Sequence, residues 1–539
     1  MIGNMMNSPL LVSDIFKTAA MRYPEQAIVS RIGDHTIHSY TYLDAYKRTC
    51  QLANALTGLG VTTGDRVATL AWNNYRHLEL YYAIGGSGAV IHTLNARLFT
   101  NQIGWIVNHA EDKLIFVDPD LIPRLEEIQD QLVTVKAIII NCNPDEMPET
   151  SLPNVHNYET LIQDQPDSFP WPIMDENTAC GLCYTSGTTG NPKGVLYSNR
   201  STVLHAMMSG GSQYLQFDES SVVMPIVPMY HVCGWGIPYS GVLYGTKLVL
   251  PGPRLDGEAL QELIEKENVN GAYGVPTIWL NLHNYLQESG KKIPSLKVVG
   301  VGGAASPLAL VETYEKVYGI YWMGIWGMTE TSPLGTAAIQ TPALKALPQE
   351  QRFKLQASAG KAIFGIDLEI FDDEDNPVPH DGVSRGTLKA KGPWILSSYF
   401  KGEGADKFED GWFNTGDVAV IDELGYMRIV DRRKDVIKSG GEWISSVDLE
   451  NAALHDPTVN EACVIGVAHP KWDERPIMLV TLRDENKFNE ETLMNILKEK
   501  VAKWWLPDRV IVVESLPHTG TGKLRKVDLR QKYSDLLQK

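Results

Sequence analysis

The chain is poor in three features that define other classes of protein. It has six cysteines among 539 residues, too few for a disulfide scaffold at this length. No apolar run approaches the roughly 20 residues that a membrane-spanning helix needs, and the N-terminus has no basic segment followed by an apolar core. Acidic residues outnumber basic ones, and the net charge of -17 disfavours nucleic acid as a partner. These absences predict a cytoplasmic globular protein without an integral membrane segment.

The length and the order of apolar segments predict several domains of α/β type. At 539 residues the chain exceeds the size at which one hydrophobic core keeps growing. Residues 41–60, 77–89 and 121–132 have helical spacing and alternate with strand-like segments such as 66–72 and 135–141. This alternation is typical of mainly parallel sheets covered by helices. It resumes after residue 175, and a second sheet is expected from residues 181–184, 222–227, 246–251, 269–274 and 296–303.

The last third of the chain has a different pattern. From about residue 360, strand-like segments separated by turns predict a small antiparallel unit. After the polar segment 431–435, helical and strand-like segments alternate again, which predicts a separate α+β domain of roughly 100 residues. We therefore expect an N-terminal domain at 1–431, a connecting segment at 432–435 and a small mobile C-terminal domain at 436–539.

The strongest local signal is a loop rich in glycine and hydroxyl groups. Residues 184–195 read YTSGTTGNPKGV and follow a predicted strand. Glycines let backbone N–H groups approach phosphate oxygens without interference from a Cβ. The spacing is not that of a Walker A loop, because Lys193 is followed by Gly194 and not by Ser or Thr. A flexible linker is the alternative, but linkers seldom follow a core strand. The predicted phosphate-binding residues are Thr185, Ser186, Gly187, Thr188, Thr189, Gly190 and Lys193.

This loop closely resembles the signature of the adenylate-forming superfamily, which includes acyl-CoA synthetases, peptide-synthetase adenylation domains and beetle luciferases. Further signatures of the superfamily follow in the same order along nearly the whole chain. The resemblance implies an enzyme that uses ATP and Mg²⁺ to activate a carboxylic acid as an acyl-adenylate. The resemblance is compatible with a homodimer.

Two further segments complete the nucleotide site by resemblance. Gly302, Gly303 and Ala304 follow a predicted strand, where small residues let the planar adenine lie against the backbone, although a plain tight turn is the ordinary alternative. In GIWGMTET, Glu330 would bind Mg²⁺ together with Thr185, because this hard cation prefers oxygen ligands. Taken alone, a Thr-Glu pair is more often a helix N-cap. The residues expected along the nucleotide are Trp326, Gly327, Met328 and Thr329, of which Thr329 would hydrogen-bond the α-phosphate.

Four charged residues from position 417 onward match later signatures. Asp417 resembles the carboxylate that accepts hydrogen bonds from both ribose hydroxyls, and Arg432 resembles the arginine that also contacts the ribose. We assign Arg433 to a solvated surface turn. Lys434 resembles the hinge residue whose torsions change as the C-terminal domain moves. Lys523, in the turn HTGTGKL, resembles the catalytic lysine that neutralises charge between the carboxylate and the α-phosphate.

The remaining signatures favour coenzyme A as the acceptor. Gly440, Gly441, Glu442 and Trp443 resemble an element that leaves a channel for pantetheine, and a hairpin turn is compatible with this role. The stretch PMYHVCGWG has no aspartate of the kind that holds an amino group in peptide synthetases. Here His231 would line the acyl and nucleotide side, and Trp235 would border the carboxylate pocket, although a buried aromatic is more often core. Nothing in the sequence supports luciferase-like chemistry.

Within the ligases, residues 95–118 and 231–241 look most like the bacterial medium-chain branch, which includes 3-(methylthio)propionate-CoA ligases. The expected substrate is therefore a short or medium-chain acid, plausibly 3-(methylthio)propionate. A general medium-chain fatty-acid ligase is the alternative, because a thioether and an alkyl chain of similar size differ little in shape and polarity. A degenerate family member that only binds nucleotide is the non-enzyme alternative. The CxxC at Cys180 and Cys183 is assigned to strand packing.

Overall fold

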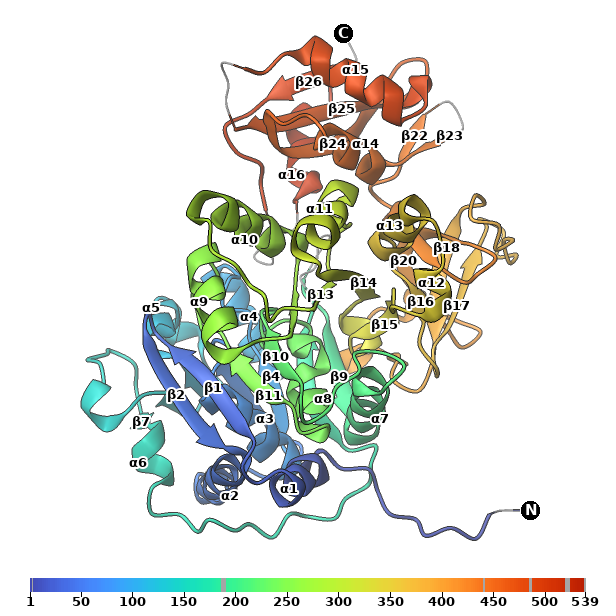
Figure 1. Ribbon diagram of the computed structural model, residues 1–539. Helices are drawn as coiled ribbons and strands as arrows, with labels where there is room; N and C mark the ends of the chain where they lie inside the picture. Colours follow the sequence, from blue (N-terminus) through green and yellow to red (C-terminus); the bar gives the residue numbers. More distant parts are fainter. Residues whose placement is uncertain (2, 186–190, 440–441, 484–486, 519–523, 538–539) are drawn as a thin grey trace.

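The computed structural model describes residues 1, 3–185, 191–439, 442–483, 487–518 and 524–537, without the side chain of Glu442 (Figure 1). Within these residues the fold is α/β, as predicted, with a large N-terminal body, an antiparallel unit and a smaller α/β unit at the C-terminal end. The N-terminal body contains two mainly parallel sheets, one of seven strands and one of nine. No helix among the described residues is both long and apolar enough to cross a membrane.

The seven-stranded sheet has the order β7-β6-β5-β3-β4-β8-β9, and only the β8–β9 pair is antiparallel. Alternate side chains of β5 pack into two different apolar clusters, so both faces of the sheet are covered. Its strands are β3 (Arg66–Leu70), β4 (Val90–Thr93), β5 (Leu114–Val117), β6 (Ala137–Ile140), β7 (Val155–Asn157), β8 (Ala179–Tyr184) and β9 (Gly194–Ser198).

The nine-stranded sheet has the order β16-β15-β14-β13-β12-β10-β11-β1-β2. One apolar cluster contains residues from both large sheets, including Phe116 of the first and Tyr273 of the second, which joins them into one body. The strands are β1 (Ala27–Ile32), β2 (Thr36–Thr41), β10 (Val222–Pro225), β11 (Lys247–Leu250), β12 (Gly271–Gly274), β13 (Val298–Val301), β14 (Tyr321–Gly327), β15 (Leu334–Ala337) and β16 (Lys361–Ala362).

Helices flank these sheets. The α-helices of the body are α1 (Val12–Arg22), α2 (Tyr42–Gly58), α3 (Tyr75–Gly86), α4 (Thr100–Ala110), α5 (Ile122–Glu126), α6 (Tyr158–Ile162), α7 (Asn199–Gly210), α8 (Ile237–Leu243), α9 (Gly257–Glu267), α10 (Pro276–Ser289), α11 (Leu308–Tyr318), α12 (Pro342–Lys345) and α13 (Gln349–Ala357). Short 3-10 helices include η1 (Pro119–Leu121), η2 (Gln129–Gln131), η3 (Pro144–Glu146), η4 (Val232–Gly236) and η5 (Thr329–Thr331).

Two expectations about the body were wrong. Residues 181–184 were expected in the second sheet, but β8 pairs with β4 in the first, and the N-terminal strands β1 and β2 extend the second instead. Strand-like spacing is local, whereas the choice of neighbour depends on packing. Residues 121–132 do not form one helix, because Ile128 has φ −119° and ψ 12°, outside the helical region, and separates α5 from η2.

The antiparallel unit and the C-terminal unit follow in sequence, with the C-terminal unit at the top of Figure 1. The first contains β17 (Asp367–Phe371), β18 (Gly386–Lys391), β19 (Phe408–Glu409), β20 (Trp412–Ile421) and β21 (Met427–Arg432), with η6 (Phe400–Gly402) and η7 (Ala405–Lys407). The second contains β22 (Ile437–Ser439), β23 (Glu442–Ile444), α14 (Ser446–Ala453), β24 (Val459–His469), β25 (Asp473–Leu482), α15 (Glu490–Lys500), η8 (Lys503–Trp505), β26 (Arg509–Val512) and α16 (Lys526–Tyr533).

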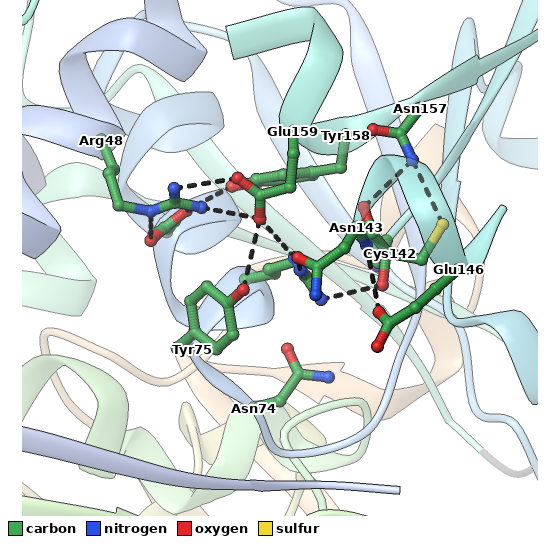
Figure 2. Close-up of polar contacts among 12 residues, drawn as sticks. Arg48, Asn74, Tyr75, Cys142, Asn143, Glu146, Asn157, Tyr158 and Glu159 are labelled. Carbon is green, nitrogen blue, oxygen red and sulfur yellow. Dashed lines mark hydrogen bonds and ion pairs between the residues drawn. The ribbon is translucent and has the colours of Figure 1, made fainter. Parts of the chain in front are cut away.

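An ion network that the sequence did not predict joins three helices of the N-terminal body. Figure 2 shows Glu159 of α6 between Arg48 of α2 and Tyr75 of α3. The oxygens of Glu159 lie 2.9 Å from Arg48 Nη1 and 2.8 Å from Arg76 Nε. Arg48 also lies 2.7 Å from the fully buried carboxylate of Glu79. Because each buried charge has a partner of opposite sign, the network fixes the positions of α2, α3 and α6 relative to one another.

Candidate active site

The two ends of the predicted phosphate loop lie side by side. β8 and β9 form an antiparallel hairpin in which Tyr184 is paired with Gly194. Thr185 N donates to Lys193 O at 2.9 Å, and Lys193 N donates to Thr185 Oγ1 at 3.2 Å. The loop therefore connects the end of β8 to the start of the neighbouring strand β9, as expected for a loop after a strand. The predicted loop residues Ser186, Gly187, Thr188, Thr189 and Gly190 lie outside the described residues.

Glu330, the predicted Mg²⁺ ligand, lies in η5 and is buried, with 7% of its surface exposed. The hydroxyl of Tyr399 donates a hydrogen bond to Glu330 Oε1 at 2.7 Å. Burial raises the pKa of Glu330, and the bond from Tyr399 partly opposes this shift. Lys193 Nζ lies 5.2 Å from the centre of the Tyr399 ring, so this tyrosine contacts both the loop lysine and the carboxylate. The sequence did not predict Tyr399, which belongs to no recognisable motif.

Asp417 on β20 is held by two of the predicted site residues. Its side chain is buried; Trp326 Nε1 donates to Oδ2 at 3.0 Å, and Arg432 Nε lies 2.9 Å from Oδ1. The carboxylate of Asp417 raises the pKa of Arg432, and Glu330 acts on Arg432 in the same direction. Each carboxylate oxygen retains a second lone pair for another donor. Residues from β14, β20 and β21 thus converge on one carboxylate.

Gly302 and Gly303 follow β13, as predicted, and each occupies a position that favours glycine, Gly302 for lack of space and Gly303 for its backbone conformation. A Cβ on Gly302 would lie 2.7 Å from Ile325 O and 3.3 Å from Trp235 Cη2, so there is little space for a side chain. Gly303 has φ +82°, which L residues rarely adopt. Ala304 is exposed. The backbone at this position therefore presents a surface that carries small side chains only.

The segment that contains His231 and Trp235 has an unusual backbone. From Val232 to Gly236 every φ is positive, between 38° and 73°. Trp235 is buried among the hydrophobic residues of the main cluster, and its ring also lies against Gly302. His231 is partly exposed, and its backbone N–H donates to Pro228 O at 3.0 Å.

A narrow cavity of about 20 Å³ lies beside this segment. Its wall includes Tyr81, Ile91, Tyr197, His205, Cys233 and Tyr239. Tyr197 Oη donates to Thr329 O at 2.8 Å and so connects the wall to η5. Burial lowers the pKa of His205 to about 3, which leaves this ring uncharged at neutral pH. The cavity is therefore uncharged and mostly apolar, and sequence patterns gave no indication of Tyr197 or His205.

A resident metal cage is absent from the part of the chain that the structure describes, where no group of three or more His, Cys, Asp or Glu residues could hold a metal ion. Glu330 fits a more open site. Its Oε1 accepts from Tyr399, while a carboxylate offers further lone pairs to a hard cation. The remaining ligands of a Mg²⁺ ion at Glu330 would come from phosphate oxygens and the hydroxyl of Thr185.

The predicted C-terminal site residues are only partly described. Gly440, Gly441 and Lys523 lie outside the described residues, and the backbone of Glu442 pairs with Ser439 in the β22–β23 hairpin. Trp443 packs on Val418, Val420, Val430 and Val436, and its carbonyl accepts from Arg385 Nη1 at 2.8 Å. Along β20, Ala419 and Ile421 pack with Trp326 on the opposite face. In this arrangement Trp443 therefore lies on the face away from Trp326.

The segment 432–435 forms a tight turn, because Arg432 O accepts from both Asp435 N and Val436 N, at 2.8 and 2.9 Å. Lys434 O accepts from Arg530 Nη1 at 2.8 Å. Arg433 is about half exposed and pairs with Asp373 at 2.9 Å, in agreement with a surface turn. Cys180 and Cys183 are buried on β8 and form no disulfide, and Cys180 Sγ lies 3.4 Å from Thr202 Oγ1, in agreement with strand packing.

Comparison with known proteins identifies the family. Residues 16–400 match the AMP-binding enzyme family, and residues 448–523 match the AMP-binding enzyme C-terminal domain. The chain is 46% identical to 3-methylmercaptopropionyl-CoA ligase of Ruegeria lacuscaerulensis, over all of both chains. It is 43% identical to medium-chain-fatty-acid–CoA ligase of Ectopseudomonas oleovorans, over all of this chain and 98% of the relative.

The fold has a match among solved structures. The anthranilate CoA ligase AuaEII, crystallised with anthranoyl-AMP, superimposes with a TM-score of 0.87 at 24% identity and covers 98% of each chain. At this identity the likeness concerns the fold alone. The family match and the two full-length relatives confirm the resemblance that the motifs predicted, and the chain belongs to the AMP-binding enzyme family.

Proposed function

We propose that this chain is an ATP-dependent acid-CoA ligase, which converts a carboxylate through an acyl-adenylate to an acyl-CoA and releases pyrophosphate and AMP. The observation that carries the proposal is the convergence of Trp326 and Arg432 on the buried carboxylate of Asp417, with Glu330 close enough to act on Arg432. These are the four positions at which an adenylate-forming enzyme is expected to hold a ribose and a metal-bound phosphate.

In the first half-reaction, a carboxylate oxygen of the acid attacks the α-phosphorus of ATP, and the bond to pyrophosphate breaks. The acid is already an adequate nucleophile, so positioning and charge neutralisation supply most of the acceleration. Asp417 would orient the ribose, and Thr185, Lys193 and Thr329 would bind phosphate oxygens. Glu330 and Thr185 would hold Mg²⁺, which would neutralise phosphate charge. Lys523 would stabilise the charge that develops between the carboxylate and the α-phosphate.

In the second half-reaction, the thiolate of coenzyme A attacks the acyl carbon, and AMP leaves. Lys523 and Gly441 are about eighty positions apart in the sequence of the C-terminal domain. We therefore expect different positions of that domain to serve the two steps. We assign residues 432–435 as the hinge, with Lys434 as the residue whose torsions change. The pantetheine channel would then be formed by Gly440, Gly441, Glu442 and Trp443.

The substrate that we favour is a short or medium-chain acid, among which 3-(methylthio)propionate is the first candidate. The names of the two relatives support both this acid and medium-chain fatty acids. The uncharged, mostly apolar wall of the cavity beside residues 232–236 supports an apolar acyl group over a charged one. His231 would border this group on the nucleotide side. We further propose a cytoplasmic location.

The test is pyrophosphate release with ATP, Mg²⁺ and a panel of acids, followed by acyl-CoA detection after coenzyme A is added. The panel contains 3-(methylthio)propionate, butyrate, octanoate, palmitate and coumarate. We expect the highest kcat/KM for the short and medium straight-chain acids. ADP and acyl-phosphate as products would contradict the adenylate mechanism, and a panel without any turnover would favour a protein that only binds nucleotide.

A further inference from the structure

A buried charged cluster joins the end of β21 to the C-terminal unit. Lys526, the first residue of α16, is 9% exposed, and its ammonium lies 2.7 Å from Glu450 Oε1 of α14. The same ammonium donates to Ser446 Oγ, and Ser446 donates to Asp431 Oδ2 through its hydroxyl and, at 2.8 Å, its backbone N–H. A continuous path of polar contacts thus runs from α16 through α14 to Asp431.

A second contact joins the same helix to the predicted hinge. Arg530, one turn after Lys526 on α16, forms an ion pair with Asp435 and donates to Lys434 O at 2.8 Å. The start of α14 is held as well, because Ser445 Oγ donates to Val430 O at 2.7 Å. The C-terminal unit therefore contacts residues on both sides of Arg432 and Arg433.

The three charged groups of this cluster depend on one another. It contains one ammonium and two carboxylates, and burial raises the pKa of both Asp431 and Glu450. Burial alone would lower the pKa of Lys526, but the carboxylates of Glu450 and Asp431 raise it instead. A buried charge that loses its partner is strongly destabilising, so the three groups are stable in this position only together.

The residues of the cluster lie on both sides of segment 432–435 in the sequence. Asp431 precedes segment 432–435, whereas Ser446, Glu450 and Lys526 follow it. A rotation of the C-terminal unit about this segment would therefore move Ser446 relative to Asp431, because the two residues belong to different bodies. The contacts between Asp431, Ser446, Glu450 and Lys526 thus favour the arrangement in which they are seen.

The hairpin β22–β23 identifies the arrangement in which the cluster is closed. Trp443 of this hairpin packs against Val418 and Val420, on the face of β20 opposite to that of Trp326. Trp443, the one residue of the predicted pantetheine element whose side chain is described, therefore lies on the face of β20 away from Trp326, which binds Asp417. This arrangement does not suit the attack of coenzyme A, and it leaves adenylation as the step that it serves.

We propose that Lys526 and Asp431 are positioning residues that hold the C-terminal unit in the arrangement for adenylation. Lys526 stands three positions after Lys523 in the sequence, so an anchored Lys526 limits the region that the predicted catalytic ammonium can reach. Neither residue touches the reacting atoms in this scheme. The inference rests on the proposed two-step function.

The test measures the two half-reactions separately. Adenylation is followed by the exchange of labelled pyrophosphate into ATP, and thioester formation is followed from supplied acyl-AMP and coenzyme A. Lys526→Met keeps the length of the side chain and removes its charge. We expect the ratio of the adenylation rate to the thioester rate to fall at least tenfold. Lys526→Arg, which keeps the charge, should restore most of the ratio, and Asp431→Asn should lower it in the same way.

A matched control separates positioning from a general loss of stability. Lys389 of β18 is also a buried lysine, paired with Asp375 at 2.7 Å, but its partners lie within the antiparallel unit. Lys389→Met should leave the ratio unchanged even if the melting temperature falls. If Lys526→Met and Asp431→Asn, shown by circular dichroism to be folded, slow both steps equally or neither step, the inference is overturned. A wild-type protein without pyrophosphate exchange would overturn the proposed function, and this inference with it.

Discussion

The hydroxyl of Tyr399 donates to Glu330 Oε1 at 2.7 Å, and the ring of the same tyrosine lies under the ammonium of Lys193. One side chain from outside every recognised motif therefore contacts two residues that the motifs predicted. Because Glu330 is buried, the orientation of its carboxylate depends on this donor.

Replacement of Tyr399 by Phe should impair the use of Mg·ATP. A hydrogen bond to a charged group contributes about 1.5–3 kcal/mol, so we expect the KM for Mg·ATP to rise about tenfold or more. Kinetics at varied Mg²⁺ concentration measure the effect. Tyr426→Phe, at another buried tyrosine of the same region, serves as the control and should leave the KM unchanged. A normal KM in Tyr399→Phe would show that Glu330 does not need this donor.

The carboxylate of Asp417 should be needed for nucleotide binding even without catalysis. Asp417→Asn replaces one oxygen by an NH₂ group, which weakens the contact to Arg432 and removes an acceptor for the ribose. We expect AMP to bind about 10- to 100-fold more weakly in calorimetry, the effect of one lost charged hydrogen bond. The exposed Asp367, whose contact to Lys391 is 3.7 Å long, supplies the control Asp367→Asn. Equal affinities of the two variants would exclude Asp417 from the ribose site.

Chain-length preference should depend on Ile91, which lines the narrow cavity. Ile91→Ala removes apolar volume from the wall, so we expect kcat/KM for octanoate relative to 3-(methylthio)propionate to rise about tenfold, the order of a methylene-sized change in a pocket. Both Ile91→Ala and its control Ile115→Ala should lose about 2–5 kcal/mol of stability, because both residues are buried in the same sheet. An unchanged preference in Ile91→Ala would place the acyl group elsewhere.

Two variants of the C-terminal domain should separate the half-reactions. Lys523→Ala should slow adenylation by about 100-fold or more, as for the loss of an oxyanion-type donor, and should spare thioester formation from supplied acyl-AMP. Gly441→Leu should have the opposite selectivity, because a bulky side chain would obstruct pantetheine. Pre-steady-state assays of each step decide between the two. Equal losses in both steps for both variants would contradict the use of two domain positions.

The stability of the fold should decrease between pH 5 and pH 7 because of Asp118. Burial raises the pKa of this carboxyl group from 3.8 to about 7. Between these values the folded state binds more protons than the unfolded state, so the stability that Asp118 contributes is complete below pH 4 and is lost as the pH rises through 7. The slope is at most about 1.4 kcal/mol per pH unit for one group.

Two substitutions test whether Asp118 is the group that titrates. Asp118 accepts from Trp72 N, Asn74 Nδ2 and Asn141 Nδ2 at 2.8 to 2.9 Å, while Asn141 Oδ1 has no partner. In Asp118→Asn, a rotated Asn141 amide can accept from the new NH₂ group, and the pH dependence of the melting temperature should flatten. Asp120→Asn, at the exposed neighbour, should retain the wild-type slope. A slope that survives in Asp118→Asn would assign the titration to another group.

Many elements of this protein follow from local sequence. The helix at α2 was predicted from its apolar spacing, and the structure adds a capping box at Thr41 and Asp44 that accounts for its start. The antiparallel unit and the C-terminal unit were predicted from strand spacing and turns. The chemistry of the family was predicted because its residues lie in short contiguous motifs, such as those around Lys193, Glu330 and Asp417, that are visible without any fold.

Tertiary structure alone decided which residues from distant segments meet. Tyr399 reaches Glu330 across 69 positions, and Tyr197 reaches Thr329 across 132, so no local pattern could reveal either pair. The placement of β8 in the first sheet and the cluster of Asp431 with Lys526 have the same origin. Periodicity and motif spacing record which face of an element is apolar and which groups stand close along the chain. The partner of each face depends on packing over the whole molecule, because burial against any apolar neighbour is favourable regardless of its distance in sequence.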